Sequence, residues 1–557
     1  MKQRMILLLL LAGALQTLWA QPAIRERAYV QTDKESYLAG ELVWMKMITT
    51  TPDGHPLPFS KVGYVELLDS ASARVQTKLM LQNGTGSATL LLPTSLPTGC
   101  YRLVGYTRHM QNESPEIFFE KILGVINPLS PEVARPDHGS AGLFPGMTGE
   151  ANIGNRGIRV AVDNNPFAPR SRVEARISGL PEKMHTLSIS VSGRDVTGIL
   201  PVPGLDRWNN ALPGLTAGPL SSEYLAEYEG HIVLGKIAAE DSGVSDTWLL
   251  PMLAFPGNDV QVFDGRTTGN GTVLFFTQGA DGYRETITTV SGTHADKYHI
   301  DIESPFARNH LVKALPLPDL ARLDKEQVQK QSVAMQVQYA YLNDSLMRFD
   351  YNAPHFFWKP DKRYIMEEYT KFGTLGEVLT EFVTFVRFTR IDGKRKISLA
   401  QETTGFNNSS TLVLLDGVPV LDHELLWDYN PLLLERIDVY YERYVMGGKI
   451  CDGIVALYTA ENKYPELKVD PSTRFFSYES PQAPRLFFSP DHSAGVRNRL
   501  PDYRHTLYWD ADLRTEGNDT VTVPFYTSDL TGDFRITVEG LTSEGETVSA
   551  TADFRVR

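Results

Sequence analysis

One run of four residues with metal-binding side chains is the most concentrated chemistry in this sequence. It is the segment HADKYHID, whose potential ligands are His294, Asp296, His299 and Asp301. Imidazole nitrogens and carboxylate oxygens bind Zn²⁺ in proteins, and side chains along one side of a strand can converge on an ion. The same pattern also describes a solvated strand edge, which is the interpretation we favour. We therefore predict no metal site.

The sequence contains none of the common catalytic motifs. It has no GxSxG nucleophile elbow, no HExxH zinc helix and no glycine-rich phosphate loop. The pair His423-Glu424 is not followed by a second histidine at the required spacing. The two cysteines, Cys100 and Cys451, are too few for a disulfide scaffold, and we favour two inert thiols over a bridge. We expect no enzyme activity, no catalytic residues and no cofactor.

The first twenty residues predict export. Lys2 and Arg4 precede an apolar run, and the segment ends on a small residue, Ala20, which is the pattern of a secretory signal that is removed on maturation. The apolar run is shorter than the ~20 residues that cross a bilayer. No later apolar run is long enough, so we predict no transmembrane segment of the chain's own. The formal net charge of −13 argues against nucleic acid as a partner.

The pattern along the chain predicts a mainly β protein. Short segments rich in Val, Ile, Thr, Tyr and Phe alternate with Gly, Pro, Asn and Asp, as in tandem Ig-like β-sandwiches. Helix is expected at Lys325–Tyr341, although its period is unclear, and after Thr374, which stands with Glu377 at capping-box spacing. The predicted units are a signal peptide (1–20), three β-sandwiches (21–126, 150–220 and 221–303), a connector (304–365), a small α+β domain (366–462), a Pro- and aromatic-rich linker (463–498) and a C-terminal β-sandwich (499–557).

The first predicted sandwich carries YVQTDKESYLAGELVWMKM (29–47) and TGCYRLVGYT (98–107). These segments resemble the MG2-type domain of the alpha-2-macroglobulin superfamily, except that Ala39 replaces the usual Pro. The resemblance implies that 150–220 and 499–557 are further macroglobulin-like sandwiches, whereas 221–303 is closer to a carboxypeptidase-regulatory-like sandwich. Neither cysteine is followed by Gly-Glu-Gln, so the thioester of the protease-trapping macroglobulins is excluded.

A second resemblance lies further along the chain. STLVLLDGVPVLDHELLWDY (410–429) is followed by LLLERIDVYY (432–441) and GIVALYT (453–459). In that order these segments resemble the plug domain of TonB-dependent outer-membrane receptors. The resemblance implies a hairpin around Asp416-Gly417 and one small mixed sheet. The residues expected to share that sheet are Val413, Val420, Ile437 and Val455.

A receptor plug is normally followed by a barrel of about 22 strands, each of about 9–11 residues. Only 98 residues follow Thr459, so we expect a plug-like domain without a barrel of its own. It would bind a separate outer-membrane β-barrel protein or envelope complex. The residues expected to meet this partner are Asp416, Gly417, Pro419, Arg436, Asp438 and Glu442.

These patterns lead to one main hypothesis and two alternatives. The main hypothesis is a non-enzymatic scaffold or accessory subunit that is associated with the outer membrane, in the periplasm or at the cell surface. The first alternative is a thioester-less, macroglobulin-type protease-binding protein, with 463–492 as its exposed bait segment. The second alternative is a surface adhesin or glycan-binding protein.

Overall fold

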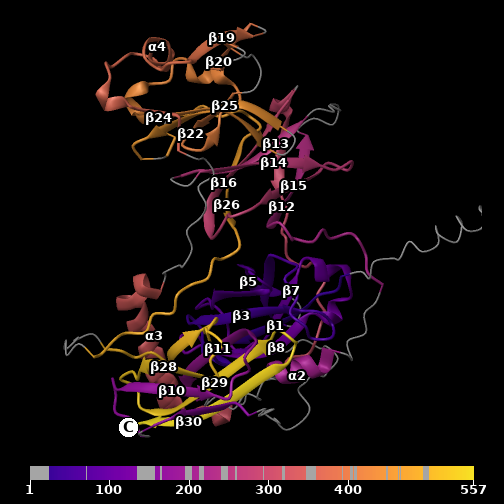
Figure 1. The fold of residues 1–557 in the computed structure, drawn as a ribbon, viewed down its shortest axis with the longest axis vertical. Helices are drawn as coiled ribbons and strands as arrows, with labels where there is room; N and C mark the ends of the chain where they lie inside the picture. Colours follow the sequence, from indigo (N-terminus) through magenta and orange to yellow (C-terminus); the bar gives the residue numbers. More distant parts are fainter. Residues whose placement is uncertain are drawn as a thin grey trace, which may run out of the picture.

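The computed structural model places the chain in two lobes (Figure 1). It describes residues 24–557, apart from 70–71, 135–156, 164–165, 195–203, 213–218, 240–248, 258–259, 293, 317–319, 347–358, 392, 402–404, 407–410, 447–448, 462, 465 and 494–500. The predicted signal segment therefore lies outside the described residues. The lobe drawn at the bottom of Figure 1 holds two β-sandwiches, and the upper lobe holds a third sandwich with a mixed α+β module above it. The mainly β prediction is confirmed.

The first sandwich is built from residues 27–126. One sheet has the strand order β1-β3-β6 and the other has the order β2-β8-β7-β4-β5. The strands are β1 (Arg27–Thr32), β2 (Ser36–Leu38), β3 (Leu42–Thr50), β4 (Val62–Leu68), β5 (Ala73–Met80), β6 (Thr85–Leu91), β7 (Gly99–Thr107) and β8 (Phe119–Ile126). Their apolar side chains form one core, which helix α2 (Leu205–Ala211) joins through Leu205 and Trp208.

The second sandwich combines segments from far apart in the sequence. Its sheets have the orders β28-β10-β9 and β27-β11-β29-β30. The strands are β9 (Arg159–Val162), β10 (Arg172–Ser178), β11 (Met184–Gly193), β27 (Thr506–Asp510), β28 (Thr520–Tyr526), β29 (Gly532–Thr542) and β30 (Thr547–Val556). The predicted sandwiches 150–220 and 499–557 are thus one domain, which corrects the sequence-based division. Neither segment has enough strands to cover its own apolar face.

The third sandwich is formed by one continuous seven-stranded sheet of order β17-β12-β15-β14-β13-β16-β26, whose strands β12, β15 and β17 share a core with β13, β16 and β26. Its strands are β12 (His231–Ala239), β13 (Leu250–Phe255), β14 (Gln261–Thr267), β15 (Thr272–Thr277), β16 (Tyr283–Ser291), β17 (Tyr298–Ile302) and β26 (Arg474–Glu479). The last strand comes from the segment predicted to be a linker, 463–498. It pairs antiparallel with β16 and brings the side chain of Tyr478 into the core. The linker prediction is therefore wrong for this part.

The mixed module begins before the predicted boundary at 366, with a strand from the predicted connector. Its main sheet has the order β18-β24-β25-β22-β23, in which β22 is parallel to β25 and the other pairs are antiparallel. A second small sheet has the order β19-β20-β21. The elements are β18 (Lys362–Ile365), α4 (Leu375–Glu381), β19 (Val386–Ile391), β20 (Lys394–Gln401), β21 (Gly405–Phe406), β22 (Leu412–Leu415), β23 (Val418–Pro419), the 3₁₀ helix η7 (His423–Leu426), β24 (Leu434–Met446) and β25 (Lys449–Thr459).

Local signals inside this module are confirmed. Thr374 accepts a hydrogen bond from the backbone N–H of Glu377, whose side chain returns one, so the predicted capping box is present. The predicted hairpin at Asp416-Gly417 joins β22 to β23. Val413, Ile437 and Val455 lie in the one mixed sheet, and the N–H of Val420 donates to Val413 O at 2.9 Å.

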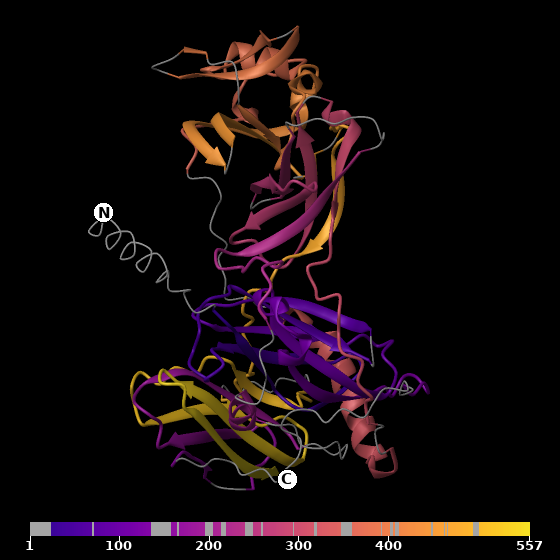
Figure 2. The same ribbon diagram turned by 90° about the vertical axis from the view of Figure 1, so that its right-hand side faces the viewer.

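Both faces of the mixed sheet are buried. Side chains alternate along its strands, so neighbouring residues contribute to opposite faces. Val413, Val439 and Val455 pack on one face against α4, β19 and β20. Leu414, Ile454 and the other side chains of the opposite face pack against Ala254, Val260 and Ile287 of the third sandwich. Figure 2 shows this stack, with the α4–β20 layer at the far end of the molecule. The module is thus attached to the third sandwich by an apolar contact as well as by the chain.

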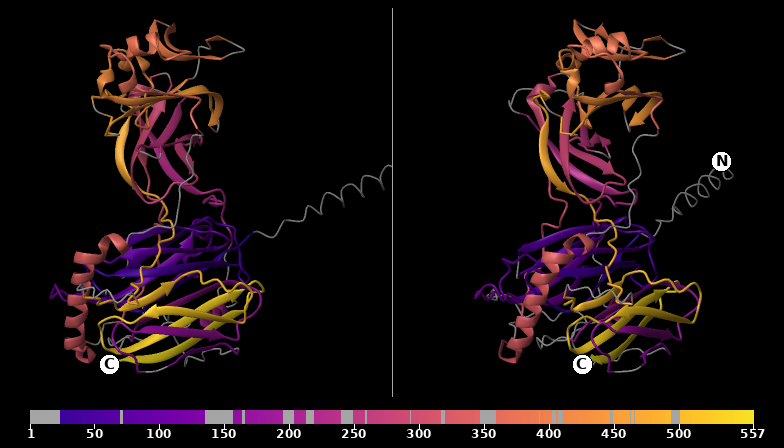
Figure 3. Two further views of the ribbon diagram at one scale, coloured as in Figure 1. Left: turned by 60° about the vertical axis from the view of Figure 1, so that its left-hand side comes forward. Right: turned by 90° about the vertical axis from the view of Figure 1, so that its left-hand side faces the viewer.

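Helix α3 (Lys325–Leu346) lies along the outside of the lower lobe (Figure 3). The predicted helix at Lys325–Tyr341 is thereby confirmed. Met335 packs against Leu38 and Ile126 of the first sandwich, while Val333 is 50% exposed. The helix therefore contacts the lobe along a narrow apolar stripe.

Candidate binding surface

The predicted partner contact Asp416 lies in the interior of the module. Its side chain is fully buried and accepts hydrogen bonds from the backbone N–H of Thr459 at 2.7 Å, the Thr459 hydroxyl at 2.6 Å and the N–H of Tyr464 at 2.7 Å. Its φ of 49° and the 91° of Gly417 are the left-handed pair that a tight hairpin turn needs. Asp416 therefore holds the hairpin onto the end of β25.

The tip of the same hairpin contacts the chain's own third sandwich. The N–H of Gly257 donates to Asp416 O at 3.2 Å. A Cβ atom at Gly417 would lie 2.8 Å from Val260 Cγ2 and 2.9 Å from Pro256 Cα. Glycine is therefore needed here both for its backbone conformation and for the close approach of the two domains.

The other four predicted contacts divide into interior and surface positions. Pro419 is buried, and Asp438, which is 1% exposed, accepts a bidentate pair from Arg363 at 2.7 and 2.8 Å. The half-buried Arg436 stacks on the Tyr458 ring at 3.9 Å and lies 3.4 Å from Asp438. Glu442 is exposed on β24. The partner-binding role of the set stays a prediction, and Glu442 is the member that presents its carboxylate to solvent.

The distal end of the module is the β19–β20 hairpin, which is anchored through β20. Arg395 pairs with Glu424 at 2.5 Å and lies 4.4 Å from the Trp427 ring centroid. The N–H of Ile397 is hydrogen-bonded to His423 Nδ1 at 2.9 Å. These contacts join one edge of β20 to η7. This surface is not among the predicted partner contacts, although the cluster of basic residues in VRFTRIDGKRKIS (386–398) could have indicated it.

Phe385 lies immediately before β19 in an unusual conformation. Its φ is 65°, which is rare for a bulky residue, and its side chain is 56% exposed. The Phe385 ring stands edge-on to the Tyr441 ring, with the two centroids 5.8 Å apart. The backbone carbonyl of Phe385 accepts a hydrogen bond from Ala400 N–H at 2.8 Å. A strained backbone that holds a large apolar side chain in solvent is a feature that often marks a functional surface.

The joint between the lobes is a buried polar network. Glu227, which is 1% exposed, accepts from the Tyr64 hydroxyl at 2.9 Å and from Ile232 N–H at 2.8 Å, and pairs with His231 Nδ1 at 2.8 Å. His231 Nε2 lies 2.7 Å from the hydroxyl of Tyr478. Burial lowers the pKa of His231, so this ring favours its neutral form. The network links the first sandwich to β12 and β26 of the third.

A second contact across the joint comes from the segment after β26. The backbone of Gln482 exchanges hydrogen bonds with Lys78 and Met80 on β5, and its side chain bonds to Thr77 and Thr89. Residues 472–473, 478 and 480–483 are buried. The expectation that 463–492 forms an exposed bait is therefore wrong for this stretch, because it completes one sheet and binds another.

The motif that resembles MG2 domains has a structural role here. Asp33 accepts from the Tyr37 hydroxyl at 2.7 Å and from the Thr506 hydroxyl at 2.6 Å, which joins the first two sandwiches. Lys34 pairs with Glu41 at 2.7 Å. Burial raises the pKa of Asp33, although each of these hydrogen bonds favours its charged form. In this chain, Asp33 of the motif thus serves a contact between two domains.

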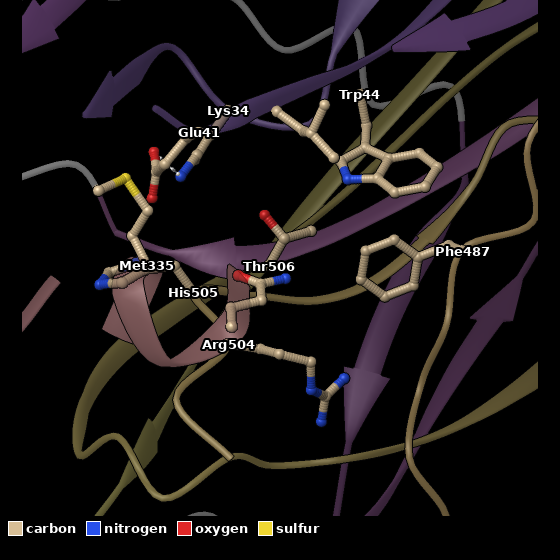
Figure 4. A pocket seen from close by; sticks show the side chains of 10 residues that line it. Lys34, Glu41, Trp44, Met335, Phe487, Arg504, His505 and Thr506 are labelled. Atoms are coloured by element: carbon tan, nitrogen blue, oxygen red, sulfur yellow. Dashed lines mark hydrogen bonds and ion pairs between the residues drawn. The ribbon is translucent and has the colours of Figure 1, made fainter. Parts of the chain in front are cut away.

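A small cavity lies beside this motif (Figure 4). Trp44 and Phe487 meet edge to face at one side of it, and Met335 and His505 line the other. Its volume is about 40 Å³, close to the ~30 Å³ that one water occupies and far below the ~300 Å³ of a small metabolite pocket. We assign it to the packing of three segments, and not to ligand binding.

The remaining sequence candidates are dispersed. His299 lies 3.5 Å from Asp301, and His294 is in the left-handed conformation before a 3₁₀ turn. Within the described ranges, no three metal-ligating side chains gather at one point. Cys100 and Cys451 are both buried and are not bonded to each other, and burial raises the pKa of the Cys100 thiol to about 11. The expected absence of enzyme activity stays a prediction.

The longest helix in the described part of the chain is α3 (Lys325–Leu346). No helix there combines the length and the apolarity that a bilayer span requires.

Comparison with known proteins gives a fold-level result. No protein-family model matches the chain, and no curated protein does. The structural neighbours are bacterial alpha-2-macroglobulins. A Salmonella alpha-2-macroglobulin is 9% identical over 97% of this chain and 40% of its own, with a TM-score of 0.24. The native form of the Escherichia coli protein is 10% identical over 96% and 40%, with a TM-score of 0.24.

An Escherichia coli adhesin, FdeC, is also similar in part. It is 14% identical over 53% of this chain and 65% of its own, with a TM-score of 0.15. This chain spans about 40% of the length of the macroglobulin chains. Scores of this size reflect a shared type of β-sandwich and carry no argument about activity or partners.

Proposed function

We propose that this protein is a non-enzymatic, exported scaffold of the bacterial envelope that presents its plug-like module to a separate outer-membrane β-barrel protein. The observation that carries the proposal is the position of this module. It lies at one end of the long axis of the molecule, on top of three sandwiches (Figures 1 and 2). The resemblance of 410–459 to receptor plugs supplies the class of partner.

The joints between the domains support a scaffold. Glu227 and Gln482 connect the lobes through buried hydrogen bonds, and Gly417 sits in close contact with Val260. Buried, fully bonded polar networks specify one arrangement of the groups that they join. Such a body would hold its distal module at a defined distance from its lower lobe, which is what a docking subunit requires.

The arrangement of the module also limits where a partner can bind. One face of its main sheet is covered by the third sandwich and the other by α4, β19 and β20. A partner would therefore meet the outer rim and the distal layer, and not the sheet faces. The protease-binding alternative loses the central part of its bait segment, since Tyr478 and Gln482 are buried in intramolecular contacts.

Affinity purification from detergent-solubilised membranes of the native host tests this proposal. The tagged full chain should retain a large β-barrel protein, identified by mass spectrometry. Glu442→Arg should reduce its recovery, because Glu442 is the exposed member of the predicted contact set, whereas Glu182→Arg, an exposed carboxylate on the lower lobe, should not. Recovery of the wild-type chain alone from solubilised membranes would contradict the proposal.

A further inference from the structure

The β19–β20 hairpin carries a positive charge that differs from the rest of the chain. Between Val386 and Gln401 the sequence has five basic residues and one acidic residue, Asp392, which lies outside the described residues, while the whole chain has a net charge of −13. The basic positions are Arg387, Arg390, Lys394, Arg395 and Lys396. A cationic surface at the end of an acidic body attracts anionic groups.

Only some of these basic side chains form ion pairs within the described part of the chain. Lys394 and Arg395 pair with Asp422 and Glu424. Arg390 and Lys396, by contrast, make no ion pair with any residue that the structure describes. Arg390 also stands directly opposite Arg395 in the strand register. Like charges at such a cross-strand position destabilise a sheet, so the fold itself gives no reason for Arg390.

Within the described part of the chain, the outer edge of β19 is open. In the sheet order β19-β20-β21 it is the terminal strand. No backbone hydrogen bond joins residues 387–391 to any described residue other than those of β20. Five of its six residues are exposed or half-buried. An open edge of this kind can accept an additional strand, and the added backbone hydrogen bonds then supply affinity.

Phe385 gives this edge an apolar end. Its ring is 56% exposed beside Tyr441, one residue before β19 begins. Aromatic and arginine side chains are the residues that most often dominate the energy of a protein–protein interface. The strain at φ 65° keeps this ring at the entrance to the open edge.

We propose that the open edge of β19 binds an extended, acidic segment of a partner protein as an additional strand. The segment would place carboxylates against Arg387 and Arg390 and an apolar residue against Phe385. This inference rests on the proposed docking function and names the surface and the partner chemistry that it uses. A protein segment fits better than an anionic membrane. Its backbone can pair with the N–H and C=O groups of a strand edge, whereas lipid headgroups do not form such a ladder.

The test uses the purified full chain and fluorescent 12-residue synthetic peptides, with binding measured by anisotropy. The first peptide carries Asp or Glu on both faces of an extended strand, interspersed with Val and Thr, and contains one Phe, because Arg387 and Arg390 lie on opposite faces of β19. The second replaces the acids by Asn and Gln, and the third keeps the acids but has two central prolines, which cannot donate to a strand ladder. Vesicles of phosphatidylglycerol and phosphatidylcholine in a 3:7 ratio are the membrane probe.

We expect the first peptide to bind at low salt and the other two to bind at least about tenfold more weakly. Arg387→Glu/Arg390→Glu should weaken the first peptide by at least about tenfold. Arg176→Glu/Lys236→Glu, which reverses two exposed cations on β10 and β12, should leave it unchanged. Thermal unfolding of all variants checks that each is folded.

Three results would overturn the inference. They are equal binding of the first and third peptides, no effect of the hairpin variant, and binding to vesicles without binding to the first peptide. None of them depends on a captured barrel. Failure of the docking function, seen as no barrel in the membrane purification, is therefore distinguishable from failure of the edge to bind acidic strands.

Discussion

The first sandwich and the β19–β20 hairpin place their charged residues in opposite ways. In the first sandwich Arg27, Lys46, Glu66 and Lys78 are at most 2% exposed. In the hairpin, Arg387 and Arg390 are exposed on a strand edge that has no backbone partner among the described residues. Both regions are β-structure, so the difference does not come from the type of fold.

The comparison separates two uses of charge. A buried ionised group is strongly unfavourable unless hydrogen bonds or an opposite charge compensate for lost water. In the first sandwich some of these groups bond within the domain, as Arg27 does with Glu113, and others lie where another segment crosses it. Glu66, for example, accepts from Tyr106 and lies 3.1 Å from His310 of the connector. Some buried charges of the first sandwich therefore join it to other segments, whereas Arg390 of the hairpin is exposed and makes no ion pair with a described residue.

The largest effect on stability is expected from removing the buried charge of Glu227 at the joint. Glu227→Ala leaves the Tyr64 hydroxyl, His231 and the N–H of Ile232 without their acceptor. We expect a loss of about 3–5 kcal/mol in the free energy of unfolding, because each buried donor left unsatisfied costs about 1–3 kcal/mol. Urea denaturation followed by tryptophan fluorescence measures it. Glu229→Ala, at an exposed position two residues away, should change stability by less than about 0.5 kcal/mol.

Acid should weaken the lower lobe through His505. Burial, and then Lys34, lowers the pKa of His505 to about 4, whereas an unfolded histidine titrates near 6.5. Folding therefore favours the neutral ring. Its contribution, up to about 3 kcal/mol, is complete above pH ~6.5 and is lost as the pH falls toward 4. Thermal unfolding between pH 7 and 4.5 should show a steeper decrease for the wild type than for His505→Gln, and parallel curves would refute this assignment.

The contact between the module and the third sandwich can be tested at Gly417. Gly417→Ala combines a positive φ with a collision against Val260 and Pro256, and we expect about 2 kcal/mol of destabilisation. Gly393→Ala has a similar φ of 82° but no neighbour within 4 Å, so it isolates the backbone effect of about 1 kcal/mol. Limited proteolysis of 360–460 should increase for the first variant, and similar behaviour of both would argue against a tight contact.

The smallest stability effect is expected at the hairpin. Arg387→Glu/Arg390→Glu should change the free energy of unfolding by less than about 0.5 kcal/mol, because exposed charges contribute little to folding. Arg390 and Arg395 lie directly opposite each other on the two strands, and removing the repulsion between them would even favour a slight gain in stability. Differential scanning calorimetry beside the wild type measures this. A loss above about 2 kcal/mol would show that these charges are structural, as in the first sandwich.

Several local elements could be predicted from short sequence segments. The capping box at Thr374, the hairpin at Asp416-Gly417 and the helix near Lys325 all appeared at the expected residues. Each depends on residues within a few positions of one another. The helix after Thr374 ends at Glu381, although its apolar pattern continues to Val386, because the chain turns there to start β19.

The predicted partner contacts show where such reasoning fails. Asp416 and Asp438 are polar residues beside turns and strands, which is typical of surface positions. In the structure they are buried because Thr459, Tyr464 and Arg363 supply their hydrogen bonds. Those donors lie between 43 and 75 residues away along the chain, so no local pattern could have indicated them.

The sequence by itself determined the local elements of this protein: its turns, caps, helices and the alternation of its strands. Only the tertiary structure decided which strands pair, that β10 and β11 would meet β28 and β29 from the C-terminal segment, and that β26 would complete the third sandwich. The physical reason is that every strand offers the same backbone donors and acceptors. The choice among partners is made by the packing of side chains from distant segments, and this is also what buried one set of charges and left another exposed.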